Sequence, residues 1–126
     1  MAWQLVVRRC ARRGDTLVFK ALRSPLQRLR GLLGTGPDAS PVALVGCRQI
    51  HTVGMRYRID VAFVGANGVV LDVRNSVSPG RLLGDERAWV TLERPHQRTA
   101  WLVAGETVEM ELVEAGTWVA GSEEGK

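Results

Sequence analysis

Residues 50–73 contain the feature that most constrains the fold, two apolar segments separated by an Asn-Gly pair. Residues 59–64 are apolar except for Asp60, and residues 69–73 are mostly apolar again. Asn67-Gly68 lies between them, and this pair is favoured in tight hairpin turns because both of its residues tolerate positive φ. The stretch therefore predicts a β-hairpin, and Gly54 just before it predicts a bulge or a close backbone contact.

Five further segments show the composition or the alternation typical of strands. They are residues 3–8, 16–21, 42–45, 89–92 and 108–113. We expect the first two to form an opening hairpin around Gly14-Asp15, with residues 3–8 as an edge strand. Residues 108–113 alternate clearly between apolar and acidic positions, which predicts a half-buried strand.

One segment has the signals of a helix, residues 25–33. Ser24 is a favourable N-cap, a proline follows it, and Gly34 can take the left-handed conformation that ends a helix. Leucines recur at helical spacing, at Leu26, Leu29, Leu32 and Leu33. The pattern predicts an amphipathic helix whose leucines face the core, while Arg28 and Arg30 point to solvent or to a partner.

The remaining segments are predicted to be loops, apart from one helical turn. Gly, Pro, Ser and Asp are frequent in residues 35–41 and 75–85, and these predict two loops. Residues 95–103 could hold a helical turn with Ala100, Trp101 and Val103 facing inward. From residue 116 the composition turns to Gly, Glu and Ser, which is typical of a frayed end.

The length and composition are those of one small domain. At 126 residues the chain can bury roughly two-thirds of its unfolded surface in one core. We expect an α+β fold, compact and mostly antiparallel β, barrel-like or sandwich-like, with one or two short helices. The predicted domain spans residues 1–115, residues 116–126 form a flexible C-terminal tail, and the protein is expected to be a monomer.

Composition also indicates the compartment. Hydrophobic residues make up 45% of the chain and charged residues 24%, as in soluble globular proteins. No segment reaches the roughly 20 apolar residues that cross a bilayer, and the first residues do not form a secretory signal. A cytoplasmic protein is expected. Cys10 and Cys47 are expected to be buried free thiols, with a disulfide or a reactive thiol as the alternatives.

The net charge of +4 is unevenly distributed. Residues 1–30 carry eight Lys and Arg side chains against the single acid Asp15, whereas the chain from residue 91 onward carries an excess of Glu. The two ends are expected either to attract each other or to leave the basic end for an anionic partner.

The central stretch also resembles a known family. Its motif residues are Ile50, His51, Thr52, Gly54, Met55 and Asp60, followed by the strand and the Gly turn. Together with residues 28–34 (RLRGLLG), 89–95 (WVTLERP) and 104–112 (AGETVEMEL), the pattern resembles the bacterial and archaeal family known as domain of unknown function 192. The resemblance covers roughly residues 5–113 and implies a compact, mostly β domain with one or two short helices. It implies no activity.

Three departures from the family pattern stand out. Arg58 occupies the usual proline position, which removes a φ restraint before the strand. Leu33 replaces a methionine, and Arg94-Pro95-His96 replaces Pro-Ala-Gly.

The main functional hypothesis is a non-enzymatic binding or accessory module without a cofactor. Its site would be a groove between residues 51–55 and residues 75–85, and its ligand an anionic small molecule or peptide, because Arg48, Arg56, Arg58, Arg74 and Arg81 flank the central hairpin. The candidate ligand-binding residues are Arg48, His51, Thr52, Gly54, Met55, Asp60, Arg74 and Arg81.

Asp60 admits two interpretations. A carboxylate in an apolar strand needs partners, and the backbone amides of residues 51–55 or the Thr52 hydroxyl could supply them, pinning that segment to the hairpin. Alternatively, His51 and Asp60 form the acid–base pair of a small hydrolase-like enzyme, with Cys47 or Thr52 nearby.

Two further classes are weaker. His51 and His96 with Asp60 and Asp72 could form a mixed metal site, but no ligand spacing supports one, so no metal is predicted and His96 is expected to be an exposed loop residue. Nucleic acid could bind the basic N-terminal third through its arginines, although no reading motif accompanies them.

Overall fold

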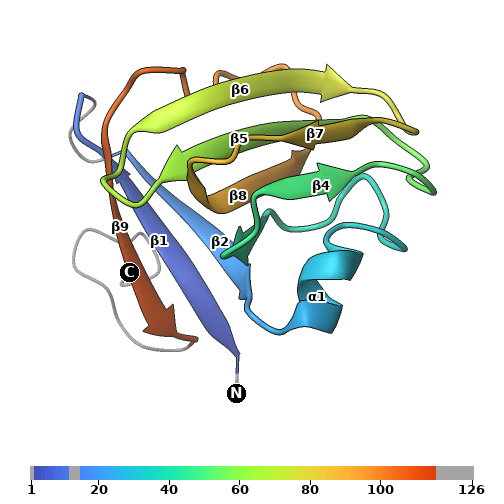
Figure 1. Cartoon of the computed structure of the whole chain (residues 1–126), viewed down its shortest axis with the longest axis horizontal. Coiled ribbons are helices and arrows are strands. Elements are labelled where there is room, and N and C mark those ends of the chain that lie inside the picture. The colour runs from blue at the N-terminus through green and yellow to red at the C-terminus, as the bar shows by residue number, and fades with distance from the viewer. Residues whose placement is uncertain (1, 12–14, 116–126) are drawn as a thin grey trace.

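The computed structural model describes residues 2–11 and 15–115, and this part of the chain is mostly β with one short helix (Figure 1). The elements in chain order are β1 (Trp3–Arg9), β2 (Thr16–Leu22), α1 (Pro25–Arg30), β3 (Val42–Val45), β4 (Gln49–His51), β5 (Ile59–Gly65), β6 (Val70–Val77), β7 (Leu82–Gly84), β8 (Ala88–Pro95) and β9 (Val108–Glu114). Gly14 and residues 116–126, for which a turn and a flexible tail are predicted, lie outside the described residues.

Seven of the strands form one mixed sheet in the order β6-β5-β8-β3-β2-β1-β9, and β4 pairs with β7 in a separate ribbon. Every pairing is antiparallel except that of β2 with β3. This parallel pair requires a crossover connection, which α1 and residues 31–41 provide. The predicted opening and central hairpins are confirmed, but β1 lies between β2 and β9 and is therefore not the edge strand we expected.

The sheet is open, so the barrel-like form of the prediction is wrong. Its two edge strands meet only near the Asn67-Gly68 turn, where Val69 bridges to Thr107 and the Val108 amide donates to the Gly68 carbonyl at 2.8 Å. Within the described ranges no longer ladder joins β6 to β9. Gly68 has φ +85°, and a Cβ there would overlap the Val108 carbonyl oxygen. A glycine is thus required where the edges approach each other.

Both faces of the central sheet are covered, which explains why every residue of β5 is buried. On one face, Ala62 and Val64 pack in a core with Leu92 of the neighbouring strand β8 and with residues of β1 and β2, among them Leu5, Val7 and Phe19. On the other face, Val61 and Phe63 pack with a second cluster that includes Leu22, Leu32, Leu44 and Ile50. The second core is covered by the segment that follows α1 and by β4, which lie near each other in Figure 1.

Helix α1 begins as predicted and ends earlier. Ser24 forms a capping box with Gln27, whose amide donates to the Ser24 hydroxyl at 3.2 Å. The helix stops at Gly31, with φ +50°, rather than at Gly34. Leu26 and Leu29 are 76% and 67% exposed, whereas Leu32, beyond the helix, is buried. The prediction that the helix turns its leucines inward is therefore wrong for the helical ones.

The predicted loop at residues 75–85 is also partly wrong. β6 continues to Val77, and β7 pairs with β4, so that Ile50 lies opposite Leu83. The helical turn expected in residues 95–103 is absent: residues 96–103 are neither helix nor strand, and although Trp101 is buried, Val103 is exposed.

The charge asymmetry along the chain is resolved partly within the fold. Arg9 is buried and its Nη2 lies 2.8 Å from the Glu106 carboxylate, while Arg8 pairs with Glu111 at 3.2 Å. The hydrogen bond to Glu106 raises the pKa of Arg9, although burial opposes the shift. The predicted attraction between the basic N-terminal and acidic C-terminal segments is confirmed for these pairs.

Two expectations about environment can be compared with the structure. No helix in residues 2–11 and 15–115 is long and apolar enough to span a membrane. Both cysteines are free thiols as predicted, but Cys10 is exposed and Cys47 only partly buried, so the expected full burial is wrong.

Candidate functional site

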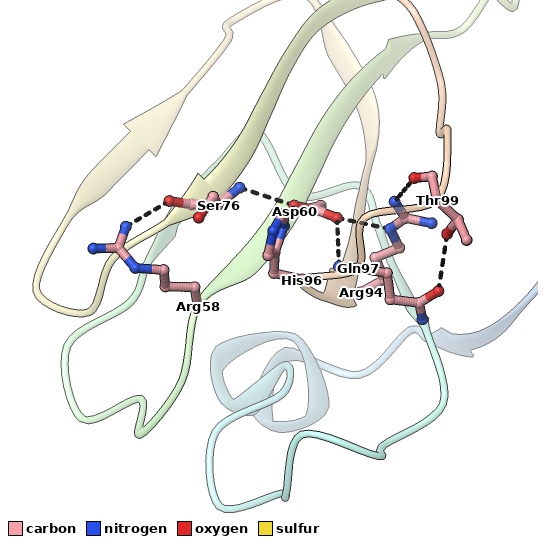
Figure 2. Close-up of polar contacts among 7 residues, drawn as sticks. All are labelled: Arg58, Asp60, Ser76, Arg94, His96, Gln97 and Thr99. Atoms are coloured by element: carbon pink, nitrogen blue, oxygen red, sulfur yellow. Dashed lines mark hydrogen bonds and ion pairs between the residues drawn. The ribbon is translucent and has the colours of Figure 1, made fainter.

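Asp60 is the centre of a buried polar network at the start of β5 (Figure 2). Its Oδ1 accepts a hydrogen bond from the Ser76 amide at 2.8 Å and lies 2.8 Å from His96 Nδ1. Its Oδ2 accepts from Arg94 Nε at 2.8 Å and from the Gln97 amide at 3.4 Å. Both carboxylate oxygens are therefore saturated by donors from β6, β8 and the segment after β8.

The partners of Asp60 are themselves held in place. Arg94, directly opposite Asp60 in the β5–β8 register, also donates to the Thr99 carbonyl at 2.8 Å and lies over the Trp101 ring at 4.9 Å. Ser76 has φ +55°, a left-handed conformation at a shift in the β5–β6 register, and its carbonyl accepts from Arg58 at 2.9 Å. The network thus ties an irregular point of β6 to residues 94–99.

The protonation of Asp60 follows from these contacts. Burial alone raises the pKa of a carboxyl group, but the bonds from the Ser76 amide, His96, Arg94 and the Gln97 amide together outweigh it. The pKa of Asp60 is consequently below its ordinary value, and the side chain is a carboxylate at neutral pH.

This arrangement corrects both expectations for Asp60. Its donors are not the amides of residues 51–55 or the Thr52 hydroxyl, and the histidine beside it is His96 rather than His51. Thr52 instead holds residues 51–55 to the turn before β7, because its hydroxyl donates to Ser78 O and accepts from the Arg81 amide, each at 2.8 Å. His96 is an exposed loop residue as predicted, with 36% of its side chain exposed, and its ring also takes part in the network through Asp60.

A cavity of about 420 Å³ lies on the side of the second core. Helix α1 and the segment that follows it form one part of its wall, and residues 46–51 form another. None of the residues in the Asp60 network lines it. Much of its wall is apolar, formed by Leu29, Leu33, Leu44, Ile50, Met55 and Ile59. Leu29 is largely exposed at this cavity, so an apolar surface continues from its wall onto the helix.

Glu93 contributes a buried carboxyl group to the cavity. It lies on β8, opposite Val42 of β3 and Val61 of β5, and is only 4% exposed. Burial raises the pKa of Glu93 to about 7, and the hydrogen bond from the Leu32 backbone only partly opposes this. At neutral pH the carboxyl group is therefore close to half ionised.

The backbone of residue 31 makes room for this side chain. A Cβ on Gly31 would come within 2.9 Å of Glu93 Oε1, and the φ of +50° also favours glycine. The helix end and the buried carboxyl group are thus packed directly against each other.

Basic side chains also line the cavity, namely Arg28, Arg30 and Arg48, together with His51. Arg28 has a fixed position, since its Nη1 donates to the Val45 carbonyl at 3.0 Å. The cavity wall holds three arginines and one carboxyl group that is only partly ionised, so the cavity carries a positive potential that favours anions.

The structure brings together only part of the predicted site. Arg48, His51 and Met55 line the cavity, and Gly54 lies with Met55 and Arg56 at an adjoining hollow. Thr52 and Asp60 are buried in structural contacts. Arg74 pairs with Asp72 at 3.0 Å and does not line the cavity, and nor does Arg81. The expected groove beside residues 75–85 is occupied by the β4–β7 ribbon, so the cavity lies elsewhere, beside α1.

Sequence reasoning missed Glu93 and Gly31. Glu93 stands two residues from Thr91 and four from Trp89, on the face of β8 that a one-sided sheet would expose to solvent. Only the burial of both faces places it inside. The signal that could have revealed Gly31 is the RLRGLLG segment. Its first glycine interrupts a leucine-rich stretch predicted to be helical, where a glycine is unfavourable unless a contact requires it.

The potential for metal binding is limited. In the part of the chain that the structure describes, no three His, Cys, Asp or Glu side chains cluster closely enough to hold a metal ion. The cavity residues offer one carboxyl group, one imidazole and one thiol among arginines, and the positive charge of those arginines disfavours a bound metal.

The fold and the cavity together define a small, mostly β domain with a ligand-sized pocket on the helix side of its sheet. The chain is similar to a protein of unknown function from Novosphingobium aromaticivorans DSM 12444, with 17% identity and a TM-score of 0.65 over 84% of this chain and 83% of that chain. It is also similar to a proposed transcription regulator from Sinorhizobium meliloti 1021, with 14% identity and a TM-score of 0.65 over 87% of this chain and 94% of that chain. These likenesses show a shared fold alone. No protein-family model and no curated protein sequence matches the chain.

Proposed function

We propose that this protein is a non-enzymatic binding module, a sandwich-like β domain whose cavity beside α1 takes a small molecule with an apolar body and an anionic head group. The observation that carries the proposal is the combination of an apolar cavity of about 420 Å³ with three arginines in its wall. Small-molecule sites have volumes of roughly 300–1,000 Å³ and combine apolar walls with a few polar groups.

The apolar wall favours a ligand with a hydrocarbon portion. Burying apolar surface contributes about 25 cal/mol per Å², and the leucines, Ile50 and Met55 offer such surface along the cavity wall. The exposed side chain of Leu29, which lines the cavity, would lose contact with water when a ligand covers it.

The arginines favour an anionic head group. Arg28 is anchored to the Val45 carbonyl, and Arg30 and Arg48 extend the positive wall. Guanidinium groups bind carboxylates and phosphates through paired hydrogen bonds, which gives orientation as well as attraction.

Binding is better supported than catalysis or nucleic-acid recognition. Cys47 lines the cavity, but its thiol donates to the Gln49 carbonyl at 3.0 Å rather than to a base. In the basic N-terminal third, Arg8 and Arg9 pair with glutamates, and Arg23 lies over the Trp3 ring at 4.9 Å. These three arginines are engaged in contacts within the fold.

We further propose that the chain belongs to the domain of unknown function 192 family. His51 and Met55, two residues of the motif that carries the resemblance, line the cavity, and Gly31 and Leu32 belong to the upstream RLRGLLG segment. Two segments of the family pattern that are distant from each other in the sequence, RLRGLLG and the central motif, would then form the binding site together.

Isothermal titration of octanoate into the full chain tests the proposal. We expect saturable binding that weakens by about tenfold in Arg48→Gln, as expected for loss of a charge-assisted hydrogen bond. Arg74→Gln is the matched control, since Arg74 is an exposed arginine outside the cavity, and its affinity should equal that of the wild type. Absence of binding to the wild type, or equal losses in both variants, would contradict the proposed function.

A further inference from the structure

Among the described residues, Glu93 is the one acidic side chain in the wall of the cavity, and its position suggests a second point of ligand recognition. It is 4% exposed, and its supporting contact is the backbone of Leu32. Buried carboxylates are normally paired with a cation or satisfied by several donors. Burial raises the pKa of Glu93, and the group that opposes this shift is the Leu32 backbone rather than an arginine side chain.

We propose that the cavity recognises a zwitterionic ligand, an ω-amino carboxylate or a molecule of like chemistry, whose ammonium group binds the Glu93 carboxylate while its anionic end binds the cavity arginines. This inference rests on the proposed function, since it takes the same cavity as the site. It adds the class of ligand: two opposite charges separated by an apolar spacer.

The geometry of the cavity supplies both ends of such a ligand. Glu93 projects from β8 against Gly31, on the side of the sheet, whereas Arg30 belongs to α1 and Arg48 to the segment that precedes β4. The wall also includes Leu44, Ile50 and Ile59, which are buried apolar side chains suited to a hydrocarbon spacer.

An ammonium group would add a cationic donor to the hydrogen bond that the Leu32 backbone gives this carboxyl group. A charge-assisted hydrogen bond from an ammonium to a carboxylate is stronger than one between neutral groups, and burial strengthens it further. A plain carboxylic acid of the same length would leave Glu93 without this partner. The difference in affinity between the amino carboxylate and the plain carboxylic acid therefore comes from Glu93 and not from the arginines.

Binding of an ammonium group has a second consequence, a release of protons. With its pKa near 7, Glu93 is about half protonated at neutral pH, and an ammonium ligand binds only the ionised form. The other titratable or charged groups in the cavity wall are Arg28 and Arg30 from the helix, and Cys47, Arg48 and His51 from residues 46–51. Comparing the wild type with a variant that lacks only the Glu93 carboxyl group distinguishes the protons released by Glu93 from those exchanged by the other groups.

The test is isothermal titration of two matched pairs, hexanoate with 6-aminohexanoate and octanoate with 8-aminooctanoate, at pH 7 in buffers of different ionisation enthalpy. For the wild type we expect at least one amino carboxylate to bind about tenfold or more tightly than its matched acid. Its binding should release protons, in an amount below one proton per ligand.

Glu93→Gln keeps the size of the side chain and removes its charge. It should lose both the preference for the amino carboxylate and the proton release, while its affinity for the plain acid changes little. Glu109→Gln, which alters an exposed glutamate of β9, is the control and should behave as the wild type.

The outcomes separate this inference from the proposed function. If the plain acids bind and the ammonium group adds nothing, or if Glu93→Gln retains the preference, the inference is overturned and the binding module stands. If neither member of either pair binds the wild type, both are overturned.

Discussion

Gly31 and Glu93 are packed closely: a Cβ on residue 31 would lie 2.9 Å from Glu93 Oε1, so the buried carboxyl group would have to shift to accommodate it. Gly31 ends helix α1, and Glu93 lies in the middle of the sheet on β8. Their contact fixes the distance between the helix end and the sheet, and so fixes one wall of the cavity.

Gly31→Ala is expected to lower the free energy of unfolding by about 2–4 kcal/mol, because it adds backbone strain at φ +50° and forces the buried carboxyl group to move. Gly80→Ala provides the control. Gly80 has φ +85°, but a Cβ at this position would meet no atom within 4 Å, so this variant should show the backbone strain alone. Urea unfolding of both variants measures the difference, and equal losses would argue against the packing of Glu93 on residue 31.

Glu93 is expected to make the protein less stable as pH rises. Its pKa is about 7 in the folded protein and near 4.5 when unfolded, so between these values the folded state binds the extra proton. The contribution of Glu93 to the free energy of unfolding is therefore greatest below pH 4.5. It falls as the pH rises from 4.5 to 7 and levels off above pH 7. At about 1.4 kcal/mol per pKa unit, the loss is about 3 kcal/mol.

Urea unfolding across this pH range measures the effect of Glu93. Glu93→Gln should remove most of the decline and should be more stable than the wild type at about pH 8. Asp60 has the opposite effect on the pH dependence of stability, because its pKa is lowered in the folded protein. Its contribution to the free energy of unfolding is lost only as the pH falls below the ordinary range of an aspartate. A wild-type stability that rises between about pH 5 and pH 7 in parallel with that of Glu93→Gln would contradict the assignment.

Asp60→Asn is expected to cost about 3–5 kcal/mol, because it leaves the buried Arg94 guanidinium without its carboxylate. Asp72→Asn breaks an exposed pair with Arg74 and should cost less than about 1 kcal/mol. Adding Arg94→Met to Asp60→Asn should restore part of the loss, since the uncompensated charge is then gone. Chemical denaturation of the wild type and these variants provides the measurement, and similar losses for Asp60→Asn and Asp72→Asn would show that the Asp60 network is not a structural anchor.

Gly68→Ala should disrupt the meeting of the two sheet edges, because its Cβ would overlap the Val108 carbonyl oxygen. Gly105→Ala, also at positive φ but with open space around its Cβ, is the matched control. We expect a lower thermal midpoint for Gly68→Ala than for Gly105→Ala, with faster hydrogen exchange at the Val108 amide. Equal midpoints would show that the close approach at Gly68 has no energetic weight.

Local signals predicted much of the β structure. The Asn67-Gly68 turn and the alternation in residues 108–113 indicated the correct hairpin and the correct last strand, because turn chemistry and strand periodicity are local properties. The start of α1 was also predictable from Ser24. The helix end was not, because Gly31 is required by a contact with Glu93, which is 62 positions away in the printed sequence.

The site was less predictable than the fold for a related reason. Arg48, His51 and Met55 were correctly expected to lie near one another, since they are close in sequence. The Asp60 carboxylate accepts hydrogen bonds from Ser76, Arg94 and Gln97. These residues are distant from Asp60 in the sequence, and the strand order β6-β5-β8 brings them beside it. The burial of Glu93 likewise depends on the covering of the second face of the sheet, which no short sequence window contains.

Amide chemical-shift mapping during titration with 8-aminooctanoate shows directly whether the cavity beside α1 is the binding site. We expect the largest shifts at Gly31, Leu32, Leu33, Gly46 and Arg48, with little change at Asn67, Gly68 and Ser76. Shifts centred on the Asn67-Gly68 turn or on the Asp60 network, or no shifts at all, would contradict it.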